Sequence, residues 1–530
     1  MEGAVENQSP SQRNYVLRAL ERFAEYGDRE AIVGRGRRLT YADLAAGVLS
    51  VAAALRANGV RSGMAVGVLV AHPPEAPTLQ LAMHLIGSRS VWIDPAALRR
   101  EVDDYLRLVP PDVLIYDPST HEEQAAQLGA RLGVPLLCLG AGGQGPNLLT
   151  PQPDAPSIAD LLGADEPQSV FQTSGTTGVP KSVHHRQALY RQLDVLAQEL
   201  LDAGERNVHH LTQTPLWHPA GQISALLYLF SGGLLVIMEK FDVGEFCATI
   251  ERERVSSVFI SPPMLYQLLD HPALDGADLS SLNLLSVGSS AAAPDRLRQG
   301  VARFGPILRI TYGLSECPFI SALPGVGDEP EHPQRLRSCG KPYGDVRVEI
   351  RGETGSVLGT GQVGEVWVAS RMNFAGYWGQ PELTAETLVD GWLRTRDLGY
   401  VDADGYLHLV GRVQDTIITG PGSRCIYPRP IEDVLVTHPK VRAAAVIGVP
   451  DTELGEAVHA FVVPDPDATV TAGELTELVR QELTPVWVPH RIQFVDSLPL
   501  TGIGKVNTKA LRARYAAEHG AAADPIGTSV

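Results

Sequence analysis

Short apolar runs alternate with helix-like segments over the first 320 residues, and this alternation limits the possible folds more than any other feature of the chain. A helical pattern begins after Thr40 and Asp43, which have the spacing of a capping box, and it ends before Gly59. Strands that alternate with helices form βαβ units, whose strands lie parallel in one sheet. The runs that we expect to form buried strands are 65–70, 91–93, 113–116, 135–139, 234–238, 258–260 and 284–287.

The pattern changes after residue 335. Short strand-like segments such as 346–350 and 364–368 are separated by glycine-rich turns, as in antiparallel sheets and small barrels. A compact tail begins after Arg412. It contains the helix-like segments 430–437 and 472–483 and the strand-like segments 443–449 and 457–463. We therefore predict an α/β fold, with a large N-terminal domain of two βαβ-type subdomains plus a small β-barrel, and a smaller α+β C-terminal domain. The second subdomain is expected to begin near residue 165.

The charge balance argues against several classes of partner. The chain has 44 Lys and Arg residues against 61 Asp and Glu residues, a net charge of −17. Nucleic acids and acidic membranes attract clustered basic residues, so we expect neither as a partner. The first residues are acidic and polar, and no run of about 18 apolar residues occurs, so we expect neither a signal peptide nor a transmembrane helix, and a cytoplasmic location. Five cysteines without C-x-x-C spacing argue against a disulfide framework or a zinc ribbon.

The segment from Phe171 to Lys181 is dense in glycine and hydroxyl residues and follows an apolar stretch. Such a loop directs backbone N–H groups toward an anion, and its hydroxyls and lysine add contacts that suit nucleotide phosphates. It is close to a Walker A loop but has Pro180 where that loop needs glycine, and proline removes an N–H donor and restricts the backbone. A plain Ser/Thr/Gly connector is the alternative that this segment alone leaves open.

Residues 173–181, Thr-Ser-Gly-Thr-Thr-Gly-Val-Pro-Lys, resemble the signature T-S-G-T-T-G-x-P-K-G of the acyl-adenylate-forming superfamily. That family contains acyl- and aryl-CoA synthetases, adenylation domains of peptide synthetases, and luciferases. Ser182 stands where the family usually has glycine.

Further segments resemble motifs of the same family in the same order. Residues 215–221 resemble P-L-F-H-x-x-G, residues 287–291 resemble its G-G-A-P strand end, and residues 311–316 resemble Y-G-x-T-E. Residues 391–399, Gly-Trp-Leu-Arg-Thr-Arg-Asp-Leu-Gly, form the most specific of these matches. Residues 411–415 then resemble G-R-x-D-D, and residues 500–506 resemble the last family motif, which contains a lysine. The resemblance extends from about residue 30 to 515.

The resemblance implies ATP-dependent activation of a carboxylic acid to an acyl-adenylate, with release of pyrophosphate, followed by transfer to a thiol of CoA or of carrier-protein phosphopantetheine. The implied catalytic residues are Lys505, Glu316, His218 and Ser315, with Mg²⁺ held by Glu316 and Thr176. ATP or AMP would be bound by Thr173, Ser174, Gly175, Thr176, Thr177, Gly178, Lys181, Ser289, Ser290, Ala291, Thr311, Tyr312, Gly313, Asp397 and Arg412.

Within this nucleotide set, Tyr312 would stack on adenine, and Asp397 would accept both ribose hydroxyls with its two carboxylate oxygens. The family also implies a division into an adenylation body, 1–413, and a mobile C-terminal cap, 414–530, which carries Lys505. Gln414 occupies the hinge position.

Three departures from the family pattern concern the segments used for thioester formation. Gln414 replaces the usual Asp or Lys at the hinge, and Gln187 stands where the family often has histidine. Ser423 and Pro430 replace a usual glycine and glutamate around the tyrosine–proline step of the cap. These departures suggest the alternative of an adenylation-only ligase that passes acyl-AMP to a separate acyltransferase or carrier protein. The competing interpretation is that Gln414 serves the hinge adequately.

The acid pocket is expected among residues that are mostly small or apolar. No buried carboxylate is apparent to pair with an α-amino group, so we expect a neutral-bodied acid with a bulky aromatic, fatty, polyketide or terpenoid group. The richness in Ala, Gly and Arg suggests a role in natural-product biosynthesis, and we expect a monomer or homodimer. The predicted pocket residues are His218, Ala220, Gly221, Ser224, Ile260, Gly288, Gly313 and Phe319.

Two alternatives come from other functional classes. One is a non-catalytic nucleotide-binding regulator on the same fold, which the presence of both Lys505 and Glu316 disfavours. The other is a zinc hydrolase, disfavoured because adjacent histidines rarely share a metal and no H-E-x-x-H motif occurs. Its candidate ligands would be His184, His185, His209, His210 and His218.

Overall fold

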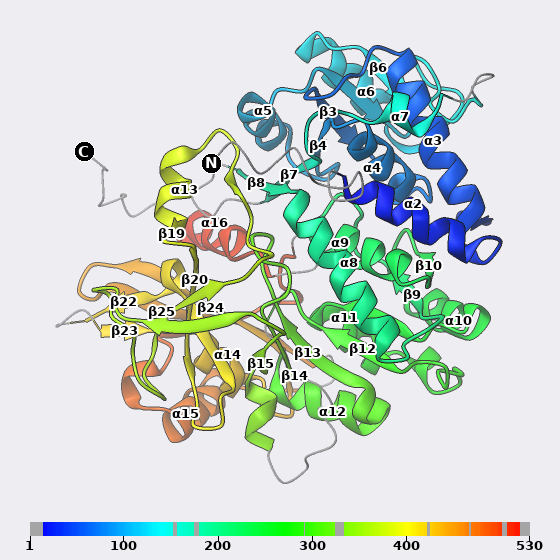
Figure 1. The fold of residues 1–530 in the computed structure, drawn as a ribbon. Coiled ribbons are helices and arrows are strands. Elements are labelled where there is room, and N and C mark those ends of the chain that lie inside the picture. The colour runs from blue at the N-terminus through cyan, green and yellow to red at the C-terminus, as the bar shows by residue number, and fades with distance from the viewer. Residues whose placement is uncertain are drawn as a thin grey trace.

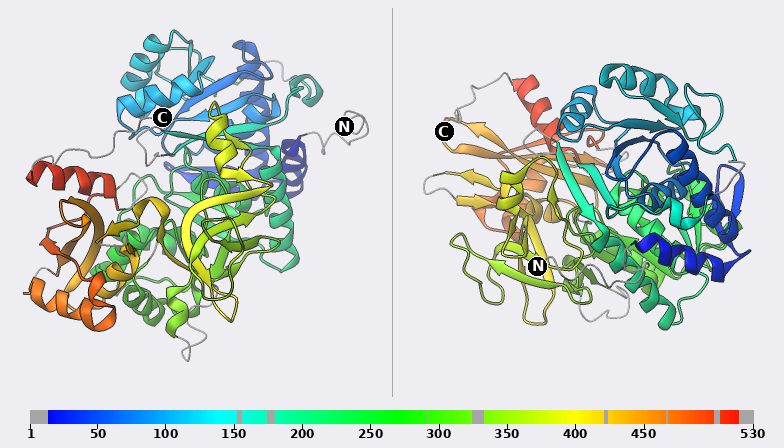
Figure 2. Two further views of the ribbon diagram at one scale, coloured as in Figure 1. Left: turned by 90° about the vertical axis from the view of Figure 1, so that its left-hand side faces the viewer. Right: turned by 45° about the horizontal axis from the view of Figure 1, so that its top comes forward.

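The computed structural model describes residues 14–151, 156–173, 180–290, 292–323, 333–420, 424–465, 468–500 and 506–519. Two large sheets flanked by helices, a smaller antiparallel sheet and a C-terminal α+β unit lie next to one another (Figures 1 and 2). The predicted α/β class is therefore confirmed.

The first sheet has seven strands in the order β18-β8-β7-β4-β3-β5-β6. Its central strands are parallel and completely buried, which explains why they are continuous apolar runs in the sequence. Its strands are β3 (Ala65–Leu69), β4 (Arg89–Trp92), β5 (Val113–Tyr116), β6 (Leu136–Cys138), β7 (Gln168–Thr173), β8 (Lys181–Arg186) and β18 (Gly376–Tyr377). The neighbouring helices are α3 (Tyr41–Ala57), α4 (Ala76–Leu85), α5 (Arg99–Leu108), α6 (Pro118–Leu132) and α7 (Ile158–Leu161).

The second sheet has nine strands in the order β15-β14-β13-β12-β11-β9-β10-β1-β2. Its strands are β1 (Glu30–Gly34), β2 (Arg37–Thr40), β9 (His209–Thr212), β10 (Leu234–Ile237), β11 (Ser257–Ile260), β12 (Leu284–Val287), β13 (Leu308–Tyr312), β14 (Ser321–Leu323) and β15 (Lys341–Pro342). Its helices are α2 (Tyr15–Tyr26), α8 (Gln187–Asp202), α9 (Pro219–Phe230), α10 (Val243–Glu253), α11 (Pro262–Asp270) and α12 (Pro294–Phe304).

The chain does not divide between these sheets at residue 165, as the sequence pattern predicts. Strands β1 and β2 from the N-terminal part complete the second sheet, whereas β7 and β8 belong to the first. Strand β1 pairs in parallel with β10, about 200 residues later. The order of apolar segments along a chain does not specify such long-range pairings.

Residues 347–412 form a five-stranded antiparallel sheet from β16 (Arg347–Arg351), β17 (Gly364–Ala369), β19 (Leu388–Val389), β20 (Trp392–Val401) and β21 (Leu407–Arg412), with α13 (Pro381–Thr387) beside it. Strands β19 and β21 both pair with β20. The strand pairings found in the described residues do not close this sheet into a barrel, so the predicted barrel is not confirmed.

The tail forms a second five-stranded sheet, coloured yellow to orange in Figure 1, beside the 347–412 sheet. Its strands are β22 (Ile417–Thr419), β23 (Arg424–Ile426), β24 (Val441–Asp451), β25 (Gly455–Pro464) and β26 (Arg491–Phe494), and its helices are α14 (Pro428–Leu435), α15 (Ala472–Glu482) and α16 (Thr508–His519). Two hydrophobic clusters of its own lie on either side of this sheet.

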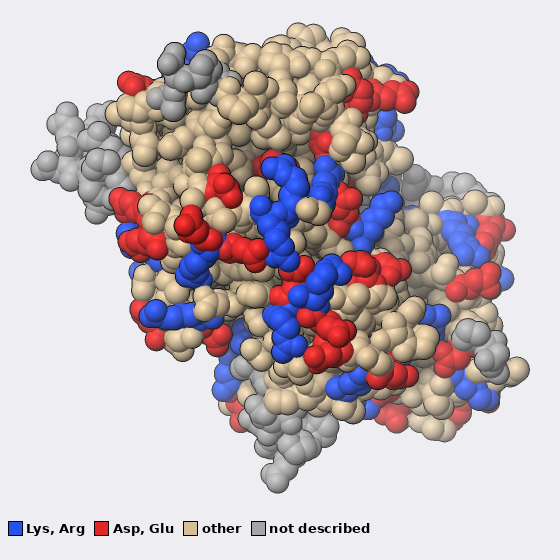
Figure 3. All heavy atoms as spheres, turned by 90° about the vertical axis from the view of Figure 1, so that its right-hand side faces the viewer, with Lys and Arg blue, Asp and Glu red and all other residues tan. Residues whose placement is uncertain are grey.

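Local signals in the sequence explain where several elements begin. Helix α3 begins after Thr40, whose hydroxyl accepts a hydrogen bond from the Asp43 N–H at 3.0 Å, while the Asp43 carboxylate accepts one from the Thr40 N–H at 2.9 Å. The predicted capping box is therefore confirmed. In the described residues, no helix is both long and apolar enough to span a membrane. On the face in Figure 3, acidic and basic side chains are interspersed and do not form a patch of one sign.

Candidate active site

Asp397 is the centre of a buried polar cluster where the second sheet meets the 347–412 sheet. Its Oδ1 lies 2.8 Å from Nε of Arg412, which is its cross-strand partner on β21, and its Oδ2 accepts a 2.6 Å hydrogen bond from the Tyr312 hydroxyl at the end of β13. Only 4% of Asp397 is exposed. The nearby Asp397 carboxylate raises the pKa of Arg412, so this ion pair is fully charged. The carboxylate is thus held in one orientation and has further lone pairs for a diol.

Glu316 lies in the loop that follows β13 and accepts a 2.7 Å hydrogen bond from the Tyr377 hydroxyl on β18. The ammonium group of Lys181, on β8, lies 5.3 Å from the centre of the Tyr377 ring. Burial lowers the pKa of Lys181, and the Glu316 carboxylate opposes that shift. Lys181 and Glu316, 135 positions apart in the sequence, are thus brought together by a tyrosine that the sequence analysis missed, although Gly376-Tyr377-Trp378 is a recognisable turn-like signal.

The loop that carries Ser315 and Glu316 is held by His185. The imidazole Nε2–H of His185 donates a 2.7 Å hydrogen bond to the Ser315 carbonyl, and burial lowers the pKa of His185 to about 4. The ring is therefore neutral near pH 7 and acts as a fixed donor to the backbone.

The five histidines considered as zinc ligands are not brought together. His184 donates to the Gln168 side chain at 3.0 Å, on the opposite face of β8 from His185. His209 donates to the Glu253 carbonyl at 2.6 Å, and a 3.1 Å hydrogen bond joins His210 to Ser257. His218 is the N-cap of α9, where its Nδ1 accepts from the Ala220 N–H at 3.2 Å.

The donor set fits a magnesium ion shared with phosphates. Within the described part of the chain, no three His, Cys, Asp or Glu side chains converge as a metal cage. Glu316 supplies one hard carboxylate close to Lys181. A single carboxylate completed by substrate phosphates is the arrangement that Mg²⁺ commonly adopts.

Glycines at the ends of β12 and β13 allow close backbone approach. A Cβ on Gly288 would lie 2.6 Å from the Thr311 hydroxyl and 3.0 Å from the Phe259 ring, and one on Gly313 would collide with the Pro318 carbonyl. A Cβ on Gly221 would collide with the Pro215 carbonyl, so packing of α9 on its own N-terminal segment accounts for that glycine. The predicted pocket residues Gly288 and Thr311 are thus direct neighbours.

One predicted pocket residue lies on the wrong face of its strand. Ile260 is completely buried in the hydrophobic cluster between the second sheet and α11 and α12. Phe259 is partly exposed on the opposite face, beside Gly288. Adjacent residues of a strand point to opposite faces, so Phe259 replaces Ile260 in the proposed pocket. Phe319 is also partly exposed and lies 6.3 Å from the ring of Tyr343.

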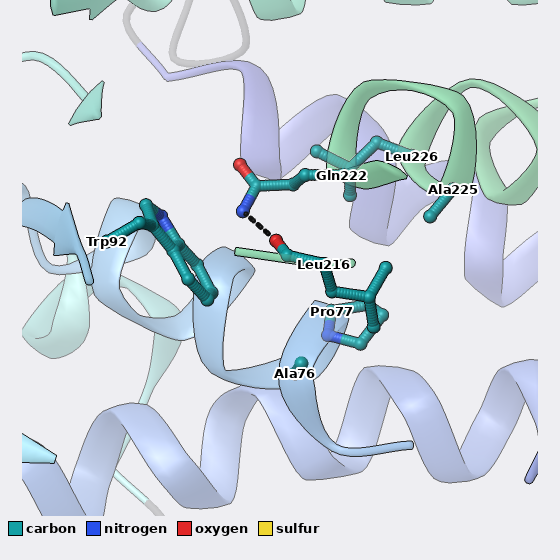
Figure 4. Close-up of a pocket in the computed structure, with 7 residues that line it drawn as sticks. All are labelled: Ala76, Pro77, Trp92, Leu216, Gln222, Ala225 and Leu226. Carbon is teal, nitrogen blue, oxygen red and sulfur yellow. Dashed lines mark hydrogen bonds between the residues drawn. The ribbon is translucent and has the colours of Figure 1, made fainter. Parts of the chain in front are cut away.

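The cavity in Figure 4 is separate from this pocket. It lies between α4, β4 and α9, is lined mainly by apolar groups, and is bridged by a 3.2 Å hydrogen bond from the Gln222 amide to the Leu216 carbonyl. Gln222 and Ala225 project from one face of α9, whereas Ser224 and Tyr228 project from another.

Several predicted residues lie outside the described part of the chain: Ser174, Gly175, Thr176, Thr177, Gly178, Ala291 and Lys505. Thr173 and Lys181 are paired where β7 and β8 meet, immediately before and after the first five of these residues. Ser289, directly after β12, has the positive φ of 72° that a sharp turn requires. Ser290 follows it.

The departures from the family pattern have different structural settings. The side-chain oxygen of Gln187 accepts a 2.9 Å hydrogen bond from the Tyr15 N–H in a buried contact between α8 and α2, so Gln187 anchors the N-terminal helix. Gln414 lies in a single 3₁₀ turn, Val413–Asp415, between β21 and β22. Pro430 lies in α14, which begins at Pro428.

Arg429 joins α14 to the segment that follows β12. Its guanidinium donates to the Ala292 carbonyl at 2.5 Å and forms a 2.7 Å ion pair with Asp433. The adjacent Glu432 accepts from the Val446 N–H at 2.8 Å. Burial raises the pKa of Glu432 to about 7, although the Arg429 charge partly opposes the shift.

We expect the Glu432→Gln variant to become more stable relative to the wild type as pH rises from 5 to 8. The pKa of Glu432 is higher in the folded than in the unfolded chain, so the folded state binds the extra proton and loses stability as pH rises through this window. Glutamine keeps the acceptor for Val446 without ionising. The difference in unfolding free energy should change by about 2 kcal/mol. Thermal unfolding of both proteins at several pH values measures it, and parallel curves would contradict the assignment.

Comparison with known proteins gives the family. The AMP-binding enzyme family matches residues 20–378, and the AMP-binding enzyme C-terminal domain matches residues 430–505. The medium/long-chain-fatty-acid–CoA ligase FadD8 of Mycobacterium tuberculosis is 35% identical over 90% of this chain and 86% of its own length.

Solved structures of the same family superpose closely on the chain. The amide bond synthetase McbA from Marinactinospora thermotolerans has a TM-score of 0.85 and 36% identity, covering 94% of this chain and all of its own. ATP-bound MatB from Rhodopseudomonas palustris has a TM-score of 0.82 and 28% identity, covering 94% of this chain and 99% of its own. With the Asp397 cluster and the Glu316–Lys181 pair in place, the chain belongs to the AMP-binding enzyme family, the acyl-adenylate-forming acid ligases.

Proposed function

We propose that this enzyme uses ATP and Mg²⁺ to convert a carboxylic acid to an acyl-adenylate, and then transfers the acyl group to the thiol of CoA or of a carrier-protein phosphopantetheine. The observation that carries the proposal is the convergence of Asp397, Arg412 and Tyr312 on one side and Glu316 with Lys181 on the other. The first set suits a ribose and the second suits phosphates.

In the first step, a carboxylate oxygen of the acid attacks the α-phosphorus of ATP while the bond to the pyrophosphate oxygen breaks. Both reactants are anions, so the site must neutralise charge as the five-coordinate phosphorus forms. Lys181 and Lys505 supply positive charge, and Asp397 with Arg412 holds the ribose so that attack is in line. Mg²⁺ between Glu316 and the phosphates would reduce the repulsion and assist the leaving pyrophosphate.

In the second step, the sulfur of the thiol attacks the acyl carbon of the mixed anhydride and AMP leaves. We propose that residues 1–413 form the adenylation body and that residues 414–530 form the cap, with the turn at Gln414 as the hinge between them. The Arg429–Ala292 hydrogen bond is a contact that such a rotation would break.

A second acceptor is favoured by a specific observation. McbA, 36% identical to this chain, is named an amide bond synthetase. The departures at Gln414 and Pro430 concern segments that the family uses for thioester formation. An enzyme that stops at acyl-AMP, and passes it to a separate acyltransferase or to an amine, is therefore the alternative.

Acid-dependent exchange of pyrophosphate into ATP tests the first step. We expect exchange with at least one member of a panel of aromatic, fatty, polyketide and terpenoid acids, and none without acid. Absence of exchange with every acid would favour a nucleotide-binding regulator. Repeating the active reaction with CoA or with an amine identifies the acceptor, because rapid acyl-CoA formation by the enzyme alone would eliminate the split reaction.

A further inference from the structure

Part of the second sheet is accessible although helices cover the rest of it. Along β12 the accessible residues alternate with buried ones, and all of β13 after its first residue is partly exposed. The cross-strand register aligns Phe259, Ser286 and Arg309 in one row. Gly288 and Thr311 lie beside this row, toward the carboxyl ends of the strands. We call these five residues the β11–β13 strip.

Arg309 is the cation of this strip, and it has no hydrogen bond or ion pair in the described part of the structure. Most described arginines on this chain are paired with a carboxylate or a carbonyl, as Arg296 is with Asp270. A partly buried guanidinium without an acceptor loses hydration and gains nothing in return. Its position on a sheet face next to the proposed acid pocket suggests that the acceptor is a ligand.

Hydroxyl groups surround the end of the strip that lies farthest from Thr311. The Arg309 charge acts on both Tyr228 and Tyr343, lowering the pKa of each against the larger effect of burial. A 2.8 Å hydrogen bond joins the Tyr228 hydroxyl to Ser257. The ring of His210 stacks on Tyr228 at 4.2 Å. This end of the strip is therefore polar, whereas the sequence predicts a pocket for a neutral-bodied acid.

We propose that Arg309 binds a second carboxylate at the far end of the substrate, so that the enzyme activates an acid carrying two anionic groups. The inference rests on the proposed adenylation function. The carboxylate to be activated would lie near Thr311 and His218, while the second reaches Arg309. Two residues along a strand span about 7 Å, so the two carboxylates are separated by a body of at least that length. A planar guanidinium binds such a carboxylate in a bidentate manner.

The selectivity of pyrophosphate exchange tests this inference. Each acid of the panel is compared as the dicarboxylic acid, its mono-methyl ester and the monoacid of equal length. We expect the wild type to prefer the diacid at least tenfold in kcat/KM. Arg309→Met keeps the stem but removes the charge, and should lose at least tenfold on the diacid while changing less than threefold on the monoacid. Arg309→Lys should recover part of the loss.

A matched control is Arg107→Met, which makes the same change at an exposed position on α5 and should alter neither substrate. Circular dichroism verifies that each variant is folded. If the best substrate has no second anionic group, or if the methyl ester equals the diacid, the role of Arg309 is refuted while adenylation stands. An unchanged preference in Arg309→Met refutes it in the same way. Absence of exchange with every acid would instead refute the proposed function itself.

Discussion

Replacing Lys505 with alanine is expected to lower acid-dependent pyrophosphate exchange about 10³-fold, while ATP binding changes less than threefold. Lys505 is the last residue matched by the AMP-binding enzyme C-terminal domain, and it occupies the lysine position of the final family motif. Its proposed role is to stabilise charge between the attacking carboxylate and the α-phosphate, which develops only in the transition state. Loss of such an interaction lowers kcat more than it changes KM.

Lys509→Ala is the matched control. It removes the same charge four residues later, at an exposed position in α16, and should leave exchange unchanged. A second assay supplies preformed acyl-AMP and the acceptor, thereby omitting the first step. The Lys505→Ala variant should then react at nearly the wild-type rate. Equal losses in both half-reactions, or normal exchange, would contradict a role confined to adenylation.

The sequence predicts the central strands well because they are buried in parallel sheets. The apolar runs 113–116 and 284–287 coincide with β5 and β12, since strands covered on both faces leave no polar position to blur their ends. What the sequence does not specify is pairing between distant segments. The exchange of β1 and β2 with β7 and β8 between the two sheets depends on contacts across more than 100 residues.

The site shows the same division between local and long-range information. Asp397, Arg412 and Tyr312 each lie in a motif that the sequence displays, and the fold brings them within hydrogen-bonding distance. Tyr377 and Arg309 acquire their meaning only from the surfaces that they face. Ile260 was chosen in place of Phe259 because composition does not reveal which face of a strand is covered.

The net charge of −17 makes the local arrangement of cations decisive. An acidic chain that binds ATP and a carboxylate gains nothing from its overall field, so aimed groups must attract and hold the anions. Arg412 is committed to Asp397, which leaves Lys181 as the described cation closest to Glu316 and Tyr377. The charge of Glu316 therefore matters twice, because it supports the ammonium form of Lys181 and supplies a ligand for Mg²⁺.

Glu316→Gln is accordingly expected to lower kcat for exchange by a factor of about 10² to 10³, with a rise in the Mg²⁺ concentration that gives half-maximal activity. Glutamine keeps the acceptor for the Tyr377 hydroxyl, so the fold around β18 should be retained. Tyr377→Phe is the matched control. It removes that hydrogen bond but leaves the carboxylate, and should cost less than tenfold without shifting the Mg²⁺ requirement. If Glu316→Gln retained both wild-type exchange and the wild-type Mg²⁺ dependence, the negative charge at this position would have no part in phosphate chemistry.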